Sequence, residues 1–255
     1  MTASTIGTRL LLPTWSLWRR EVVRFVRQRG RVIGALGTPV VFWLLIGSGL
    51  RNSFRMSGGS EKINYLEYAF PGTIVLIVLF TAIFSTISII EDRREGFLQG
   101  VLAAPVARLA IVLGKVLGSS TLAVVQSLLF LALAPLIGVP VSLLSMLGVF
   151  VVLVIVSLGL SALGFLIAWP MDSTQGFHSV MNLFLMPMWL LSGAFFPATG
   201  ASSWLGWVMR LNPLTYGVAL LRRVMYWGGS SLPEGLPSAG LSVAVTVGFA
   251  VVTIL

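Results

Sequence analysis

A chain of 255 residues in which 56% are hydrophobic and only 10% are charged has too little polar surface to enclose a soluble core. The bilayer is its expected solvent, the length suits a single helical membrane domain over residues 1–255, and the absence of cysteine excludes disulfides and thiolate metal sites. The net charge of +9 does not indicate nucleic acid binding, because lysine and arginine gather beside apolar segments, where anionic lipid and membrane orientation explain them.

Residues 14–31 are predicted to form an amphipathic helix in the headgroup region, with arginines toward phosphate and tryptophans toward the acyl boundary. The apolar positions are Trp15, Trp18, Val22, Phe25 and Val26, and the basic positions are Arg19, Arg20, Arg24, Arg27 and Arg29. A cleaved signal peptide is disfavoured because no small-residue cleavage site follows a short apolar core. A mitochondrial transit peptide is disfavoured because the helix runs straight into an apolar span.

Six apolar segments follow that are predicted to span the membrane. They cover residues 32–50, 69–90, 111–137, 141–169, 177–196 and 241–255. Each approaches the roughly 20 apolar residues that a span needs, except the last, which is barely long enough.

The distribution of lysine and arginine predicts a cytoplasmic N-terminus. The N-terminal segment carries seven arginines and one glutamate. Alternation then places residues 91–110 and 170–176 inside, and residues 51–68, 138–140 and 197–238 outside. The resulting expectation is a multi-pass protein of a bacterial inner membrane.

The segment at 197–238 is too apolar to be an ordinary loop, since it contains Trp204, Trp207 and Tyr216. Asn212-Pro213 splits it into two halves that are each too short to span a membrane. The segment therefore predicts a re-entrant helical hairpin that dips into the outer leaflet and packs against the bundle.

Residues 91–105 form the one strongly charged segment between long apolar runs. Glu91, Asp92, Arg93, Arg94 and Glu95 alternate in sign, which predicts local ion pairs. An apolar stripe of Phe97, Leu98, Val101 and Leu102 follows Gly96 and must bury against something, and Pro105 stops the helix. A solvated connector is the simpler alternative, but it does not explain the stripe.

The sequence offers little for catalysis. It has no Gly-x4-Gly-Lys-Ser/Thr motif for nucleotide, and its only histidine, His178, has no metal-binding companions. A membrane-embedded hydrolase is disfavoured, because Ser192 and His178 lie about 21 Å apart along one helix. An ion-coupled secondary carrier is disfavoured because the spans contain almost no ionisable residues at mid-depth.

The charged segment resembles the signature loop of ABC-2 type transporter permeases, from Glu91 through Leu102-Ala103-Ala104-Pro105 to Gly114-Lys115. Asn212-Pro213-Leu214-Thr215-Tyr216 with Arg222 is similar to a late motif of the same family, and Phe70-Pro71-Gly72 also fits. The chain departs from the pattern at Phe97 and Gln99, where threonine and glutamate are commoner. It also stops at Leu255 without the usual basic tail, so the sixth helix is expected to be truncated or incompletely represented.

The resemblance implies an exporter subunit that is not itself an enzyme and that moves a drug, lipid or lipid-linked glycan. ATP and Mg would be bound by a separate ATP-binding-cassette subunit, and the permease would pair with a second copy of itself or with a paralogous permease. By the same analogy, residues 14–31 and Glu91–Pro105 form the surface that contacts the ATPase. Asn212, Pro213, Tyr216 and Arg222 would help to close an outer gate.

Overall fold

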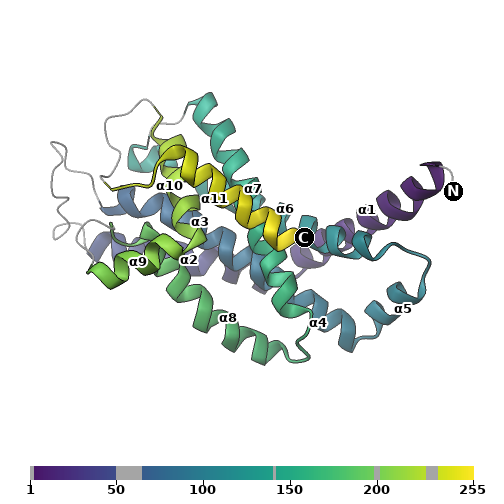
Figure 1. The fold of residues 1–255 in the computed structure, drawn as a ribbon. Coiled ribbons are helices and arrows are strands. Elements are labelled where there is room, and N and C mark those ends of the chain that lie inside the picture. Colours follow the sequence, from purple (N-terminus) through teal and green to yellow (C-terminus); the bar gives the residue numbers. More distant parts are fainter. Residues whose placement is uncertain (1–2, 50–64, 140–141, 198–201, 228–234) are drawn as a thin grey trace.

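The computed structural model describes residues 3–49, 65–139, 142–197, 202–227 and 235–255, and every regular element among them is a helix (Figure 1). The helices are α1 (Ala3–Arg27), α2 (Arg29–Gly49), α3 (Tyr65–Ser85), α4 (Ile87–Arg94), α5 (Phe97–Ala103), α6 (Arg108–Leu131), α7 (Leu143–Ala168), α8 (Thr174–Trp189), α9 (Ser203–Leu211), α10 (Pro213–Met225) and α11 (Ala239–Ile254), with short turns η1 (Ala134–Ile137) and η2 (Leu190–Ala194). The predicted all-helical class is confirmed for these residues. Most of the predicted loop at 51–68, Pro140 of the predicted turn at 138–140, and positions 198–201 and 228–234 of the predicted hairpin lie outside them.

Four helical segments are long and apolar enough to cross a membrane: Arg29–Gly49, Tyr65–Arg94, Arg108–Leu131 and Leu143–Ala168. They coincide with the first four predicted spans. The fifth and sixth predicted spans fall on α8 and α11, which have only 16 residues each. Six crossings therefore remain a prediction, while the four candidate spans are typical of a multi-pass membrane protein.

Helix α3 is the centre of the bundle, where it packs against α2, α6 and α7. Its sequence is apolar around the whole circumference, and such a helix must be covered on all sides. Phe70, Ile74 and Ile77 are completely buried. By contrast, α7 exposes Leu147, Phe150 and other large apolar side chains on one flank, as lipid contact requires.

The second predicted span, 69–90, is not one straight helix. The backbone turns at Thr86, where the hydroxyl donates to the Ile83 carbonyl at 2.5 Å while the Ser85 hydroxyl donates to the Ala82 carbonyl at 3.0 Å. Such back-bonding by serine and threonine bends helices. The charged residues 91–94 therefore lie on α4, a helical continuation of the span, and not in a loop.

A positive φ of 76° at Gly96 ends this helix and starts α5 in a new direction. Glycine adopts that backbone conformation without strain because it has no Cβ. Helix α5 ends at Ala103, because Ala104 precedes Pro105 and is extended. The prediction that Pro105 stops the helix is confirmed.

Helix α1 packs along α6. Gly114 and Gly118 permit this approach, because a Cβ on either glycine would lie 2.6 Å and 2.7 Å from the Cβ atoms of Leu17 and Glu21, respectively. The predicted helix at 14–31 ends earlier, at Arg27, and residues 29–31 begin α2.

The expected orientation of the α1 side chains is wrong for several of them. Phe25 is buried, and the Trp18 indole nitrogen donates to the Thr121 hydroxyl at 3.0 Å, so neither points to an acyl boundary. Trp15 and Arg19 are exposed, as an interfacial helix would require. The protein interior, not lipid, thus takes one face of this helix.

The two regions singled out by the sequence lie at opposite ends of the bundle. Helices α9 and α10 lie at one end, and α5 with the first turns of α1 lies at the other (Figure 1).

Candidate functional site

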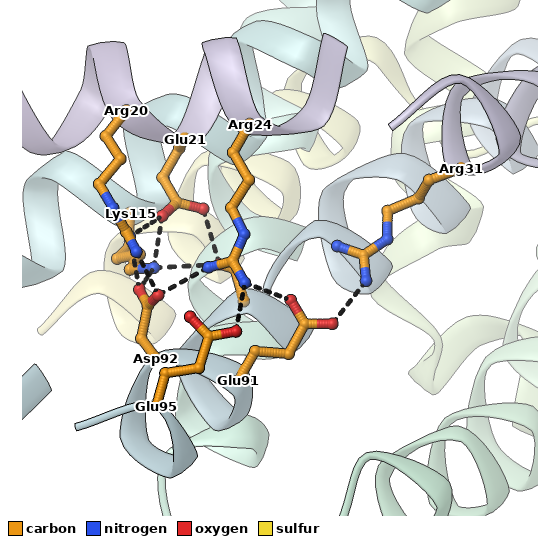
Figure 2. Close-up of polar contacts among 9 residues, drawn as sticks. Arg20, Glu21, Arg24, Arg31, Glu91, Asp92, Glu95 and Lys115 are labelled. Carbon is orange, nitrogen blue, oxygen red and sulfur yellow. Dashed lines mark hydrogen bonds and ion pairs between the residues drawn. The ribbon is translucent and has the colours of Figure 1, made fainter. Parts of the chain in front are cut away.

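Eight charged side chains from α1, α2, α4 and α6 meet where the charged segment leaves the bundle (Figure 2). We call them the charge cluster: Arg20, Glu21, Arg24, Arg31, Glu91, Asp92, Glu95 and Lys115. Four are basic and four are acidic, so the formal charges cancel.

Asp92 is the centre of the charge cluster and is completely buried. Arg20 donates to both carboxylate oxygens, at 2.6 and 2.8 Å, and Arg24 donates to Oδ1 at 2.6 Å. Lys115 from α6 donates to Oδ2. Three cations therefore surround one carboxylate, and charge-assisted bonds of this kind offset the desolvation of a buried acid. The bond to Asp92 raises the pKa of the Arg20 guanidinium above its ordinary value.

Glu21 and Lys115 form the second buried pair, with exposed fractions of 5% and 2%. Lys115 donates to Glu21 Oε1, and the Ser88 hydroxyl donates to Glu21 Oε2 at 2.6 Å. The same hydroxyl accepts from Lys115 at 3.1 Å. One polar unit thus joins α1, α4 and α6 in a region otherwise filled by apolar side chains.

Glu91 and Glu95 extend the charge cluster toward the surface. Glu91 accepts from Arg31 at 2.7 Å and from Arg24 at 3.0 Å, and Arg24 also lies 3.3 Å from Glu95. The acids of the charged segment therefore pair with the N-terminal helices. The prediction of ion pairs between neighbouring residues of the segment is therefore wrong.

Arg93 and Arg94 turn away from the charge cluster, toward the turn after α7. Arg93 donates to the carbonyls of Trp169 and Met171 and forms an ion pair with Asp172 at 3.1 Å. Arg94 donates to the Asp172 carbonyl at 2.9 Å. The two predicted cytoplasmic turns, 91–110 and 170–176, are thereby joined.

The apolar stripe of α5 buries against the chain's own helices. Leu98 is buried against Leu17 and Ile111, and the Arg20 guanidinium lies 3.6 Å from the centre of the Phe97 ring. Leu102 remains 47% exposed. The exposed face of α4 and α5 consists of Arg94, Glu95, Gln99, Gly100, Leu102, Ala103 and Pro105.

We call residues 87–103, which form α4, Glu95, Gly96 and α5, the α4–α5 joint, because they are fixed to the bundle on one side only. Balanced ion pairs and an apolar contact fix α4 and α5 to α1 and α6, while one face of the segment stays open. Among the described residues no three histidine, cysteine, aspartate or glutamate side chains gather as a metal site would require. The prediction of a chain without metal or cofactor stays untested.

At the opposite end, helix α8 is broken, and the Asn212 motif covers the break. The turn η2 follows Pro187 and contains Gly193 with a positive φ of 75°. Asn212 caps α10 by accepting from the Leu214 amide at 3.0 Å, while its amide donates to the Met188 carbonyl at 2.5 Å. Helix breaks leave carbonyls without partners, and this side chain supplies one.

Other residues of the motif add to the same contact. Thr215 donates to the Met209 carbonyl at 2.6 Å, and Tyr216 donates to the Arg210 carbonyl at 2.8 Å, which together fix the turn between α9 and α10. Pro213 occupies the first turn of α10, where its missing amide hydrogen costs nothing. The predicted division at Asn212-Pro213 into two short helices is confirmed, but their depth in a membrane is not.

Arg222 connects η2 to α3. Its Nη2 donates to the Gly193 carbonyl at 2.9 Å and to the Tyr68 carbonyl at 3.2 Å, and its guanidinium lies 4.0 Å from the centre of the Tyr68 ring. The Tyr68 hydroxyl also donates to the Gly193 carbonyl, at 3.2 Å. Tyr65 donates to the Phe195 carbonyl at 3.0 Å.

Sequence reasoning missed several residues of these two sites. Glu21 and Ser88 were not expected to take part, although a lone acid in an arginine-rich helix is a signal that could have identified Glu21. Lys115 was named only as part of the family motif, and its burial was not predicted, although the spacing of Gly114 and Gly118 around it is a signal of close helix approach. No sequence signal identifies Tyr68.

Four long apolar helices, with a charged segment fixed at one end of the bundle, are typical of a multi-pass membrane protein. The chain belongs to the ABC-2 type transporter family, whose model matches residues 13–226. It is 25% identical over 209 residues to a putative transport permease ycf38 of Cyanophora paradoxa, covering 81% of this chain and 71% of the relative. It is 23% identical over 240 residues to nodulation protein J of Rhizobium meliloti, covering 93% and 88%. A probable multidrug ABC transporter permease, YbhR of Escherichia coli, is 24% identical over 172 residues, covering 65% and 45%.

Proposed function

We propose that this chain is the membrane subunit of an exporter driven by a separate ATP-binding-cassette subunit. The observation that carries the proposal is the joint at α4 and α5 in a member of this family: its inner face is fixed to the bundle by the charge cluster, and its outer face is open. A soluble partner that grips the open face would move α1, α4 and α6 together. The exported compound would be hydrophobic or amphiphilic, in keeping with spans that carry few charges.

The burial of individual side chains decides which residues of the segment we propose as partner contacts. Asp92 and Leu98 are buried and cannot contact a second protein without unfolding the joint. Gln99 and Leu102 are exposed on α5. They lie beside Arg94 and Pro105 and are the proposed contact residues. Glu91 and Asp92 would hold the segment in place.

The natural lack of cysteine makes a direct test simple, because single cysteines can be introduced without a background. Gln99→Cys is expected to cross-link to a cassette subunit expressed with this chain. Leu211→Cys, 80% exposed at the opposite end, is the matched control and is expected to stay free. Equal cross-linking from both positions, or from neither, would contradict the proposed contact.

The same two variants test membrane orientation. In intact bacterial cells, a membrane-impermeant maleimide is expected to label Leu211→Cys and to spare Gln99→Cys, since the N-terminus and the α4–α5 joint are proposed to be cytoplasmic. The reverse pattern would invert the topology. Transport that persists without any cassette subunit would favour the secondary carrier instead. Pairing with a second copy is proposed on the same basis and is measured by the mass of the purified complex.

A further inference from the structure

A cavity of about 550 Å³ lies between η2, α9, α10 and the start of α11. Its volume is within the range of roughly 300–1,000 Å³ that holds small molecules in proteins. The residues that matter for its chemistry are Tyr68, Gly193, Gly206, Arg210, Tyr216 and Arg222. The cavity is therefore bordered by the same side chains that cover the break in α8.

The described part of the cavity wall is cationic. It includes Arg222 and Arg210, and no acid is among its described lining residues. Arg222 is only 2% exposed, yet its Nε has no hydrogen-bond partner in the described part of the chain. Both of its carbonyl bonds come from Nη2. Among the described residues, this buried guanidinium contacts two neutral carbonyls and the face of the Tyr68 ring, and none of these is a carboxylate that would offset its desolvation cost in full.

The neighbouring surface is apolar and aromatic. On α9, Trp204, Trp207 and Leu211 are 68%, 64% and 80% exposed. Arg210 lies over the Trp207 ring, with its guanidinium 5.8 Å from the ring centre. A cavity with two arginines in its wall thus opens beside an apolar helix face, and this pairing of positive charge with apolar surface is the chemical complement of an anionic amphiphile.

We propose that this cavity binds the anionic headgroup of an amphiphile, with the negative charge beside Arg222 and the acyl chain along the exposed face of α9. The proposal rests on the proposed function, because it names the class of compound that the exporter would hold at this end. A purely structural Arg222, which only covers the break in α8, is the competing explanation. The two explanations make different predictions for a variant that fills the cavity. Such a variant would block a bound headgroup, but it would not disturb an arginine that only covers the break in α8.

Gly206 provides a variant that fills the cavity without changing its charge. No atom of the described residues lies within 4 Å of a Cβ placed on this glycine, and Gly206→Phe would project a ring from the cavity wall. Gly248→Phe on α11 is the matched control, because its Cβ also meets nothing within 4 Å and it does not line the cavity. Arg222→Gln removes the charge, and Arg222→Lys retains it.

The test is equilibrium binding of a fluorescent short-chain phosphatidylglycerol to the purified full chain, measured by fluorescence anisotropy. Phosphatidylcholine with the same acyl chains provides the arm without net charge, and inorganic phosphate is the soluble competitor. Arg222→Gln and Gly206→Phe are each expected to weaken phosphatidylglycerol binding about tenfold or more, the effect of one lost charge-assisted bond. Arg222→Lys and Gly248→Phe are expected to bind within a few-fold of the parent.

Three outcomes would overturn the proposal: unchanged binding in Gly206→Phe, equally tight binding of phosphatidylcholine, or full displacement by millimolar phosphate. If Arg222→Gln does not fold, Gly206→Phe decides. The assay contains neither ATP nor a cassette subunit. A failure here therefore leaves the cross-linking test of the exporter untouched, and a failed cross-link leaves the binding result valid.

Discussion

Replacing Asp92 with asparagine is the sharpest test of the charge cluster. The substitution keeps the shape of the side chain and removes one of four negative charges, so that four cations face three carboxylates. Asp92 is completely buried, and Lys115 beside it is 2% exposed. Solvent therefore cannot reach the cation that loses its negatively charged partner.

The size of the effect follows from the burial. Removing one partner of a buried, hydrogen-bonded ion pair costs about 3–5 kcal/mol, because the remaining charge is left uncompensated. For a chain of this size, that cost lowers the midpoint of thermal unfolding by roughly 6 °C or more. Lys115→Met is expected to destabilise as well, because it leaves Glu21 and Asp92 in excess. The double variant restores the balance at three charges of each sign and should lose less than the sum of the single variants, by about 0.5–3 kcal/mol.

Thermal unfolding of the purified protein in detergent measures this cycle. Arg19→Gln is the control, because Arg19 is exposed on the same helix and makes no ion pair with another described residue. It is expected to change stability by no more than about 0.5 kcal/mol. An Asp92→Asn midpoint equal to that of Arg19→Gln would refute the argument, as would strictly additive losses in the double variant.

Two further predictions concern packing and the break in α8, and both are read from the same unfolding curves. Gly118→Ala would place a Cβ 2.7 Å from the Cβ of Glu21 and is expected to cost about 1–3 kcal/mol, whereas Gly100→Ala, with nothing within 4 Å, should be neutral or slightly stabilising. Equal midpoints would show that α1 is not held closely against α6. Asn212→Ala loses both the cap of α10 and the bond to Met188, and is expected to be less stable than Asn212→Ser, which keeps an acceptor for the cap, by about 0.5–2 kcal/mol. The opposite order would assign no role to the cap.

Much of the fold could be predicted from the sequence because it depends on local physics. Long apolar runs located the first four spans, proline located the end of α5, and Asn212-Pro213 located the division between α9 and α10. The bend at Thr86 and the π-helical turn η2 could not be predicted. Local residues take part in both, through the back-bonding of Ser85 and Thr86 and through Pro187, but such residues also occur in straight helices. The bend at Thr86 is also packed against a neighbour distant in sequence, Gly164 of α7, on which a Cβ would lie 2.9 Å from the Thr86 hydroxyl.

The charged segment was located correctly, but the partner of each charge was not. Pairing between Asp92 and Arg20 spans 72 positions and requires α1 to lie against α6. That approach depends on Gly114 and Gly118, and their role as contact positions can be identified only when α1 and α6 are seen side by side. Local alternation of charge favoured neighbouring pairs, and tertiary packing overrode it. Tyr68 could not be predicted for the same reason, because its role depends on contact with Arg222, which is 154 positions away in the sequence.

One helical path connects the two ends of the molecule. Tyr68 near the start of α3 and Asp92 near the end of α4 are 24 residues apart, because 92 minus 68 is 24, which corresponds to roughly 36 Å at 1.5 Å per helical residue. Nearly all of α3 is buried, and closely packed interiors transmit displacement instead of absorbing it. If α3 and α4 move as one rigid unit, a shift of the charge cluster displaces Tyr68 by the same movement. Within residues 65–94 the helix is interrupted only at Thr86, so a hinge that separates the motion of α4 from that of α3 would have to lie there.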